Sequence, residues 1–250
     1  MEFLKQAETS AAPFAHALTE VAGLDAFSEK IIVEMNPRAR RLGLRVEPAR
    51  QCIVLVRPRR VSDRTVIKFV TQHLAWIRKH LGAMPERVPF EHGAVIPYRG
   101  TDHVLRHAPE QKGGVWREEN TILVTGRPEH MARRTADWLK REAKESLSAL
   151  AREMAAVIAR PVARITVRDT RTRWGSCARG GKLSFSWRLI LAPDTVLTYV
   201  AAHEVAHLRH ANHGAAFKRC VDEILEPYGV EAGLAGEWLS RRGAGLHRYG

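Results

Sequence analysis

The sequence has little cysteine and no long apolar run. Its 250 residues include only Cys52, Cys177 and Cys220. Three cysteines so far apart do not make a disulfide scaffold, so we expect a reducing compartment. No stretch approaches the length of a membrane-spanning helix, and the first residues lack the continuous apolar segment of a secretory signal. We therefore expect a cytoplasmic protein without a membrane partner.

Biased composition is also absent, but acidic residues are in deficit. With 18 Gly, 12 Pro and 45% hydrophobic residues, the chain is neither collagen-like, nor of low complexity, nor wholly disordered. Lys and Arg number 40 against 27 Asp and Glu, a formal charge of +13, and two windows, 37–60 and 164–188, are rich in arginine. Such a surface can bind a nucleotide or a nucleic acid, although a solvated sheet face is also consistent with arginines that alternate with apolar residues.

The spacing of apolar residues predicts an α+β protein in three parts. Residues 1–28 form an N-terminal arm, and residues 29–125 form a β-rich module with one helix that Ser62 caps and that runs to about Leu81. Residues 126–250 form a small second domain, and the His-Glu-x-x-His pattern at residues 203–207 within it is typical of a catalytic domain of the zincin type. Its predicted elements are a long helix over 129–158, strands over 162–167 and 183–191, and helices over 193–210 and 217–225.

The predicted helix after Pro193 carries the pattern His203-Glu204-Val205-Ala206-His207. Two histidines four residues apart lie on the same face of a helix, so their imidazoles can hold one metal ion. Glu204 stands beside that face, where a carboxylate can take a proton from a metal-activated water. Zn²⁺ suits this set, because it accepts neutral imidazole and keeps a fourth position open for catalysis. The surrounding residues are apolar, which makes an unpartnered buried His-Glu-His set costly.

A third ligand is needed, and the spacing leaves alternatives. His213 follows the helix break at Asn212 and can swing back to the ion, so we favour it. His210 is the rival on a nearby helix face, and a downstream carboxylate is the other solution: Glu223, Glu226, Glu231 or Glu237. The spacing also matches the metzincins, but those proteins need a methionine turn after the site, and the last methionine here is Met154.

Two stretches resemble a known family. Residues 173–177 read Arg-Trp-Gly-Ser-Cys, and residues 203–217 read His-Glu-Val-Ala-His-Leu-Arg-His-Ala-Asn-His-Gly-Ala-Ala-Phe. Together with 186–193, over about residues 30–240, they resemble the YgjP-like metallopeptidases, which are related to the SprT-like zinc peptidases. The resemblance implies a zinc peptidase domain of minimal gluzincin type. In it His203, His207 and His213 would bind the metal and Glu204 would be the catalytic base. One difference is Ser186, where the resemblance implies asparagine.

Other side chains near this motif have two interpretations each. Arg173 can contact substrate or stabilise an oxyanion, or it can make a structural salt bridge. Tyr199 can donate to an oxyanion, although a buried tyrosine more often bonds the backbone. Cys177 could be a fourth, inhibitory zinc ligand, but it would close the site.

The sequence therefore predicts a zinc-dependent hydrolase, foremost a metallopeptidase that acts on a peptide or protein substrate. One alternative keeps the metal and hydrolyses the phosphoanhydride bond of a nucleoside triphosphate, with the Arg-rich surface holding the phosphates. Another alternative is a nucleic-acid-binding module with a structural metal. Assays of peptide and nucleotide hydrolysis with and without chelator distinguish these functions.

Overall fold

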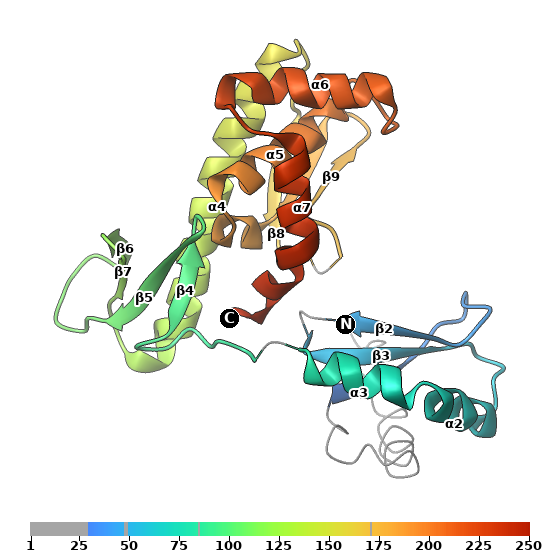
Figure 1. Cartoon of the computed structure of the whole chain (residues 1–250). Helices are drawn as coiled ribbons and strands as arrows, with labels where there is room; N and C mark the ends of the chain where they lie inside the picture. The colour runs from blue at the N-terminus through green and yellow to red at the C-terminus, as the bar shows by residue number, and fades with distance from the viewer. Residues whose placement is uncertain (1–29, 48–49, 85, 171) are drawn as a thin grey trace. The chain divides into compact units, whose positions relative to one another are not determined.

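A computed structural model describes residues 30–47, 50–84, 86–170 and 172–250 (Figure 1). The predicted arm, residues 1–28, lies outside the described residues. The chain forms two compact units, Met1–Glu86 and Arg87–Gly250, which we call unit 1 and unit 2. Helices and mixed sheets occur in both, as expected for an α+β protein.

Unit 1 is a three-stranded sheet with two helices. The strand order is β1-β3-β2, with β1 (Ile31–Met35) parallel and β2 (Gly43–Glu47) antiparallel to the central β3 (Cys52–Arg57). Helices α2 (Asp63–Gln72) and α3 (Leu74–Gly82) pack on one face of this sheet. The core between them consists of apolar residues from both layers: Ile31, Val33, Ile53, Leu55, Val66, Val70, Ile77 and Leu81.

The single helix predicted in this unit is divided in two. Ser62 caps α2, since its hydroxyl accepts from the Thr65 amide, as the sequence predicts. The helix then ends at His73, whose backbone leaves the helical region (φ −108°, ψ 13°) before α3 begins. Apolar residues keep their three-to-four spacing across this point, so the sequence contains no signal for the break.

Unit 2 begins with a four-stranded sheet of order β4-β5-β7-β6, whose strands are β4 (Val95–Tyr98), β5 (Thr101–His107), β6 (Val115–Glu118) and β7 (Thr121–Val124). A 3₁₀ turn, η3 (Pro128–His130), leads into the long helix α4 (Met131–Val157). The four-stranded sheet and α4 share one core. Its fully buried members include Ile96, Leu105 and Ile122 of the sheet and Leu139 and Leu147 of α4.

The boundary between the units therefore differs from the one that the sequence predicts. The spacing of apolar residues places the boundary at 125–126, whereas the structure divides at Glu86–Arg87. The strands between these positions were expected to belong to the N-terminal module. They instead share their buried face with α4, which makes them part of the unit that carries the metal motif.

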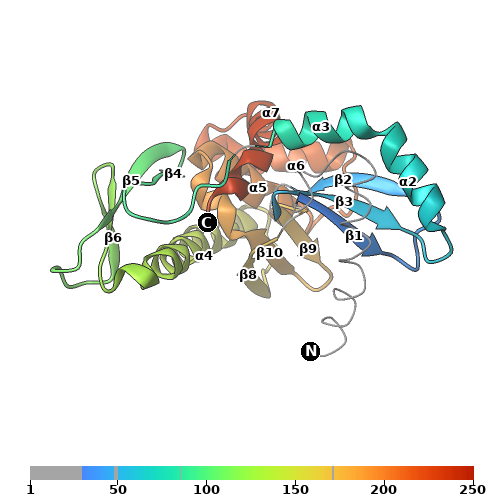
Figure 2. The ribbon, with the colours of Figure 1, turned by 90° about the horizontal axis from the view of Figure 1, so that it is seen from below.

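The second sheet of unit 2 has the order β8-β10-β9, with β10 (Lys182–Ser186) between parallel β8 (Arg164–Arg168) and antiparallel β9 (Gly175–Ala178) (Figure 2). Three helices follow: α5 (Asp194–Ala206), α6 (Ala215–Leu225) and α7 (Ala232–Arg242). Between them lie the 3₁₀ segments η4 (Trp187–Leu191), η5 (Glu226–Tyr228) and, at the C-terminus, η6 (Gly243–Arg248).

Two predicted elements of this region are shorter than expected. The strand predicted over 183–191 ends at Ser186, and the apolar run after it forms η4. Ser186 caps that turn, because its hydroxyl accepts from the Arg188 amide. The helix predicted to reach His210 ends at Ala206, with His207 at the C-cap.

Helix α5 is buried on all sides. It contacts α4, α6 and α7 and lies beside β9. Along its length even small residues such as Ala201, Ala202 and Ala206 are fully buried. Helix α5 is therefore held rigidly, which suits an element that carries a site. None of the helices in the described residues combines the length and the apolar character that crossing a membrane requires.

Candidate metal centre

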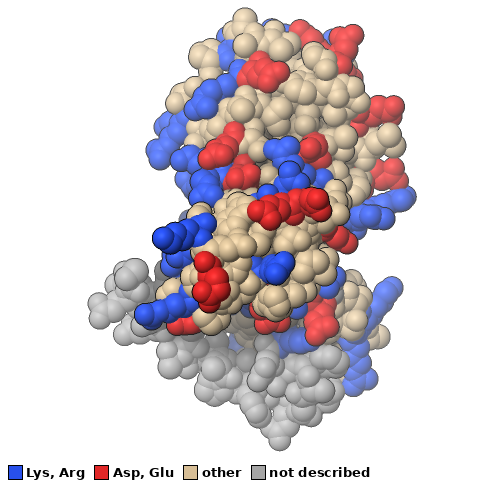
Figure 3. Space-filling view, turned by 90° about the vertical axis from the view of Figure 1, so that its left-hand side faces the viewer, with Lys and Arg blue, Asp and Glu red and all other residues tan. Residues whose placement is uncertain are grey.

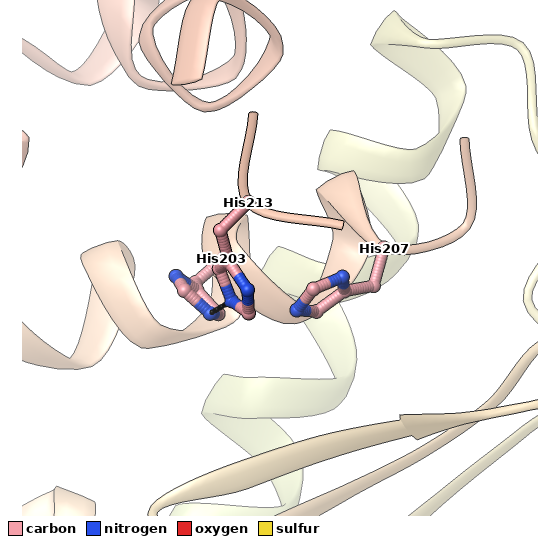
Figure 4. Close-up of side chains that lie close together, drawn as sticks. All are labelled: His203, His207 and His213. Carbon is pink, nitrogen blue, oxygen red and sulfur yellow. Dashed lines mark hydrogen bonds between the residues drawn. The ribbon is translucent and has the colours of Figure 1, made fainter. Parts of the chain in front are cut away.

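Three histidines converge at the C-terminal end of α5 (Figure 4). His203 lies in the last turn of the helix, His207 occupies its C-cap, and His213 comes from the loop before α6. Each offers one ring nitrogen, and these atoms all lie within 4.8 Å of one another. No other group of three or more His, Cys, Asp or Glu with this arrangement occurs in the described parts of the chain.

The ring nitrogens are placed for a shared ion. Nε2 of His213 lies 3.0 Å from Nε2 of His203. His207 donates from Nδ1 to the carbonyl of His210 at 3.0 Å, which leaves the lone pair on its Nε2. A backbone carbonyl that fixes the tautomer of an imidazole in this way is a common second partner of metal-binding histidines.

The surroundings of His203 favour its neutral form. Burial, followed by the nearby rings of His207 and His213, lowers the pKa of His203 to about 4. A neutral imidazole is the form that coordinates a metal ion, so His203 is suited to bind one. Three imidazole nitrogens without a thiolate or carboxylate among them fit a divalent transition metal and do not fit Ca²⁺ or Mg²⁺, which prefer oxygen.

Phe217 of α6 packs against all three rings. Its ring centroid lies 4.9 Å from that of His203, 4.6 Å from His207 and 4.7 Å from His213. The phenylalanine is buried, so it shields one side of the cluster from solvent. The sequence marks Phe217 only as a core residue, although its position four residues after His213 on the next helix is the signal for this contact.

Glu204 is buried next to the cluster. Burial raises the pKa of its carboxyl to about 7, against the opposing effect of the Arg173 charge. Across from it lies Gly175 of β9, where a Cβ atom would come within 2.5 Å of Glu204 Cγ and 2.6 Å of Oε1. Only glycine fits at this position without moving the carboxylate. The motif at residues 173–177 contains this glycine, but no local pattern in the sequence indicates its contact with Glu204.

The cluster opens on a cleft of about 560 Å³. One wall is the end of α5 with His203, Glu204 and His207, and the other wall is β9 with the turn that follows it. The cleft leaves a side of the three imidazoles accessible. A fourth position on a metal ion could therefore be reached by water or substrate, as catalytic sites require.

The rival third ligands lie elsewhere. The side chain of His210 is not in the cluster, and its carbonyl is the acceptor for His207. None of the four downstream glutamates joins the cluster either, and Glu223 and Glu237 pair with Arg209 and Arg241. Cys177 lines the cleft but lies outside the ligand group, and burial, then the charge of Glu204, raises the pKa of its thiol.

Arg173 and Tyr199 are placed differently. Arg173 is exposed, lines the cleft and acts on the charge of Glu204, and it makes no salt bridge with the described residues. Tyr199 does not line the cleft. Its ring packs edge-on against His203 with centroids 5.9 Å apart, and its hydroxyl lies close to Gly236. Arg173 thus lies in the cleft, where a substrate contact is possible. Tyr199 lies outside the cleft and packs against the ring of His203.

The chain was compared with known proteins. A family model described as the YgjP-like metallopeptidase domain matches residues 40–232. The chain belongs to the YgjP-like metallopeptidase family. The match covers most of unit 1 and the site in unit 2, and the resemblance seen in the sequence is confirmed. As a member, this protein has a domain of a metal-dependent peptidase family.

The other comparisons add little to the YgjP-like assignment. One solved structure, entitled the crystal structure of the metallopeptidase zymogen of Pyrococcus abyssi abylysin, aligns with 38% of this chain and 93% of its own. The two are 18% identical, with a TM-score of 0.33. No curated protein matches the sequence.

Proposed function

We propose that this protein is a zinc-dependent peptidase whose metal is held by His203, His207 and His213. The convergence of these three imidazoles at the edge of an open cleft is the observation that carries the proposal. Zinc fits best among the transition metals, because it takes three histidines in catalytic sites and keeps a fourth position free. When bound, the ion would polarise a scissile carbonyl and lower the pKa of a water molecule.

Glu204 acts as the general base in this proposal. Its carboxylate lies beside the histidines, and with a pKa of about 7 it can accept a proton from the attacking water at one carboxylate oxygen. The same oxygen then returns the proton to the nitrogen of the leaving amine. Arg173, at the mouth of the cleft, is suited to stabilise negative charge on the substrate carbonyl oxygen.

An extended polypeptide fits the cleft because β9 is an edge strand. Among the described strands β9 pairs only with β10, so its other edge offers unpaired backbone groups. Ser176, Cys177 and Ala178 of this strand line the cleft beside the metal cluster. A peptide can add to such an edge through main-chain hydrogen bonds, and that would bring its carbonyls alongside the ion.

Phosphoanhydride hydrolysis is the second candidate, because two arginines, Arg173 and Arg179, line the same cleft. One experiment separates the candidates. The purified protein is analysed for metal and assayed on casein, on a peptide library and on nucleoside triphosphates, each with and without chelator and added zinc. We expect about one zinc per chain and metal-dependent cleavage of peptides. Release of pyrophosphate or phosphate without peptide cleavage would favour the second candidate.

Glu204→Gln tests the mechanism. The substitution keeps the shape but removes the base, so we expect turnover to fall by 10²- to 10⁴-fold while the zinc content stays at the level of the unchanged protein. Thermal unfolding with and without zinc shows whether the variant is folded. Full activity in this variant would exclude Glu204 as the base.

A further inference from the structure

Residues 30–86, the described part of unit 1, are far more basic than the rest of the chain. Residues 1–29 hold one Lys against five Asp and Glu, so that unit 1 as a whole carries +5. Residues 30–86 contain 13 Lys and Arg against four Asp and Glu, a net charge of +9. Residues 87–250 contain 26 against 18, a net charge of +8 in nearly three times the length. On the face of the molecule drawn in Figure 3, basic and acidic side chains are interspersed. The excess of positive charge within residues 30–86 calls for a more specific explanation than solubility.

The topology of the unit 1 sheet gathers this charge at one end. Strands β1 and β3 run parallel with Met35 opposite Arg57, and antiparallel β2 starts with Gly43 opposite Val56. The β1–β2 loop (36–42) and the β3–α2 loop (58–62) must therefore leave the same end of the sheet. An amide hydrogen bond from Asn36 to the carbonyl of Arg57, 2.9 Å long, ties the two loops together at their base.

Five arginines project from these two loops. All are exposed, and among the described residues none has a carboxylate within ion-pair distance: Arg38, Arg40, Arg41, Arg59 and Arg60. We call this set the arginine end of unit 1. Nearby carboxylates already have partners, since Glu34 pairs with Arg45 at 2.7 Å and Asp63 pairs with Arg57 at 2.7 Å. Within the described part of the chain, these two carboxylates are therefore not left to pair with the five arginines.

The loops are ordered rather than free. The side chain of Asn36 accepts from the Arg38 amide at 2.9 Å, and Arg57 donates twice to the carbonyl of Val61 at 2.6 and 3.2 Å. Pro37 and Pro58 further restrict the backbone. Because the two loops are already folded, a ligand that binds the five guanidinium groups does not bear the cost of ordering the backbone.

We propose that the arginine end of unit 1 binds the phosphate backbone of duplex nucleic acid. Arginine is the side chain that contacts phosphate with two parallel hydrogen bonds, and five on adjacent loops match a polyanion with regularly spaced charges. Neither loop contains an aromatic residue, whereas proteins that bind single strands stack the bases on aromatic rings. The contacts go to phosphates, so binding is independent of base sequence.

A membrane surface fits less well. Helices or loops that bind anionic lipid combine basic residues with an apolar face that enters the bilayer. In these loops Leu42 and Val61 are partly buried, and Met35 is the one exposed large apolar side chain in the described part of unit 1. A single methionine does not make such a face. The site is also separate from the histidine cluster, which lies in unit 2.

The test measures binding of a fluorescein-labelled 20-base-pair DNA duplex by anisotropy at salt concentrations from 50 to 200 mM. Five phosphate contacts predict a slope of log K against log salt of about −4.5, so affinity should fall about 500-fold across this range. Replacing the five arginines by glutamine should abolish most of that slope. The partial variants R38Q/R40Q/R41Q and R59Q/R60Q should reduce the magnitude of the slope by about 3 and by about 2, respectively. These two variants serve as the test if the variant with all five substitutions does not fold.

The matched control removes five exposed basic residues from unit 2: K140Q, R141Q, K144Q, K218Q and R219Q. The net charge changes equally, so this variant should keep the slope of the unchanged protein. Equal weakening by both variants would overturn the proposal, as would tighter binding to phosphatidylserine vesicles than to the duplex, or absence of duplex binding at 50 mM salt. None of these outcomes bears on peptide hydrolysis, which is assayed separately.

Discussion

Gly175 leaves just enough room for the carboxylate of Glu204. A Cβ atom at this position would overlap the side chain of Glu204. The glutamate cannot move away as part of its helix, because α5 is packed against its neighbours. Gly175 thus fixes the orientation of Glu204, the residue that we propose as the general base. Correct placement of a catalytic group to within about 1 Å is worth about 10²-fold in rate.

We therefore predict that Gly175→Ala lowers the hydrolysis rate by about 10²-fold and leaves the zinc content unchanged. The three atoms nearest to the added methyl group all belong to Glu204, so the methyl group displaces the carboxylate first. Gly233→Ala in α7 is the control, because nothing lies within 4 Å of a Cβ atom there. Rates are measured with a fluorogenic peptide at saturating substrate. A variant as active as the control would show that the glutamate tolerates displacement.

The histidines at positions 203 and 210 make a second comparison of single residues. His203 contributes a ring nitrogen to the cluster, whereas His210 contributes only a backbone carbonyl to His207. We predict that His203→Ala loses its stoichiometric zinc on gel filtration and that His210→Ala keeps it, because alanine retains the carbonyl. Elemental analysis of both variants is the measurement. Zinc loss in His210→Ala with retention in His203→Ala would show that the ligand set is wrong.

At the scale of elements, the C-terminal turn η6 is held by Arg188. This buried guanidinium donates to the carbonyls of Leu246 and Tyr249 at 3.3 and 2.6 Å, and it pairs with Asp169 at 3.1 Å. His247 lies within η6 and stacks on Trp174, the residue before Gly175. The turn thereby supports the loop that limits the cleft.

His247 makes the stability of this arrangement depend on pH. Burial, then the charge of Arg188, lowers the pKa of His247 below its usual 6.5, although Asp169 acts in the opposite direction. The unfolded chain therefore takes up a proton before the folded chain does. The contribution of His247 to stability is complete above about pH 6.5 and declines as the pH falls toward the lower folded value.

We predict that the free energy of unfolding of the metal-free protein falls between pH 7.5 and 5.5, and that it falls less in His247→Gln. The glutamine stays neutral at both values, while the other histidines titrate equally in both proteins. Urea unfolding at the two pH values gives the difference. An identical pH dependence in the two proteins would mean that His247 is protonated as readily in the folded chain as in the unfolded one.

The elements also show which patterns in a sequence can be interpreted. The amphipathic stripe of α4 spans seven turns, and its period predicts the helix to within two residues at each end. The apolar run over 187–191 has no such period, because a short buried segment has no polar face to reveal it. The metal motif is local and visible in the sequence. The contact of Gly175 with Glu204 depends on the packing of β9 against α5, and the contacts of Phe217 depend on how α6 folds back over the end of α5.

At the scale of the whole molecule, each unit has its own core. The buried apolar residues of unit 1 and of unit 2 form separate clusters, and the three histidines lie entirely in unit 2. The sequence could not place the boundary, because alternating strands look alike whichever core they cover. Only their packing on α4 assigns β4 to β7 to the unit with the metal motif.

We predict that a fragment of residues 87–250 folds alone and binds zinc as tightly as the full chain does. Circular dichroism, thermal unfolding and zinc titration against a chromogenic chelator are the measurements. The fragment should lose duplex binding, because the arginine end is absent. An aggregated fragment, or zinc affinity reduced by tenfold or more, would show that unit 1 is required for the fold of the site.

The two ends of unit 2 meet in a small parallel bridge between Val88 and Tyr249. The Val88 amide donates to the carbonyl of Arg248 at 2.9 Å, and the Gly250 amide donates to the carbonyl of Val88 at 3.0 Å. Entry and exit of the chain are thus neighbours on the surface. Unit 2 is therefore suited to insertion into a surface loop of another protein. It is equally suited to circular permutation, in which its two ends are joined and the chain is opened at another loop.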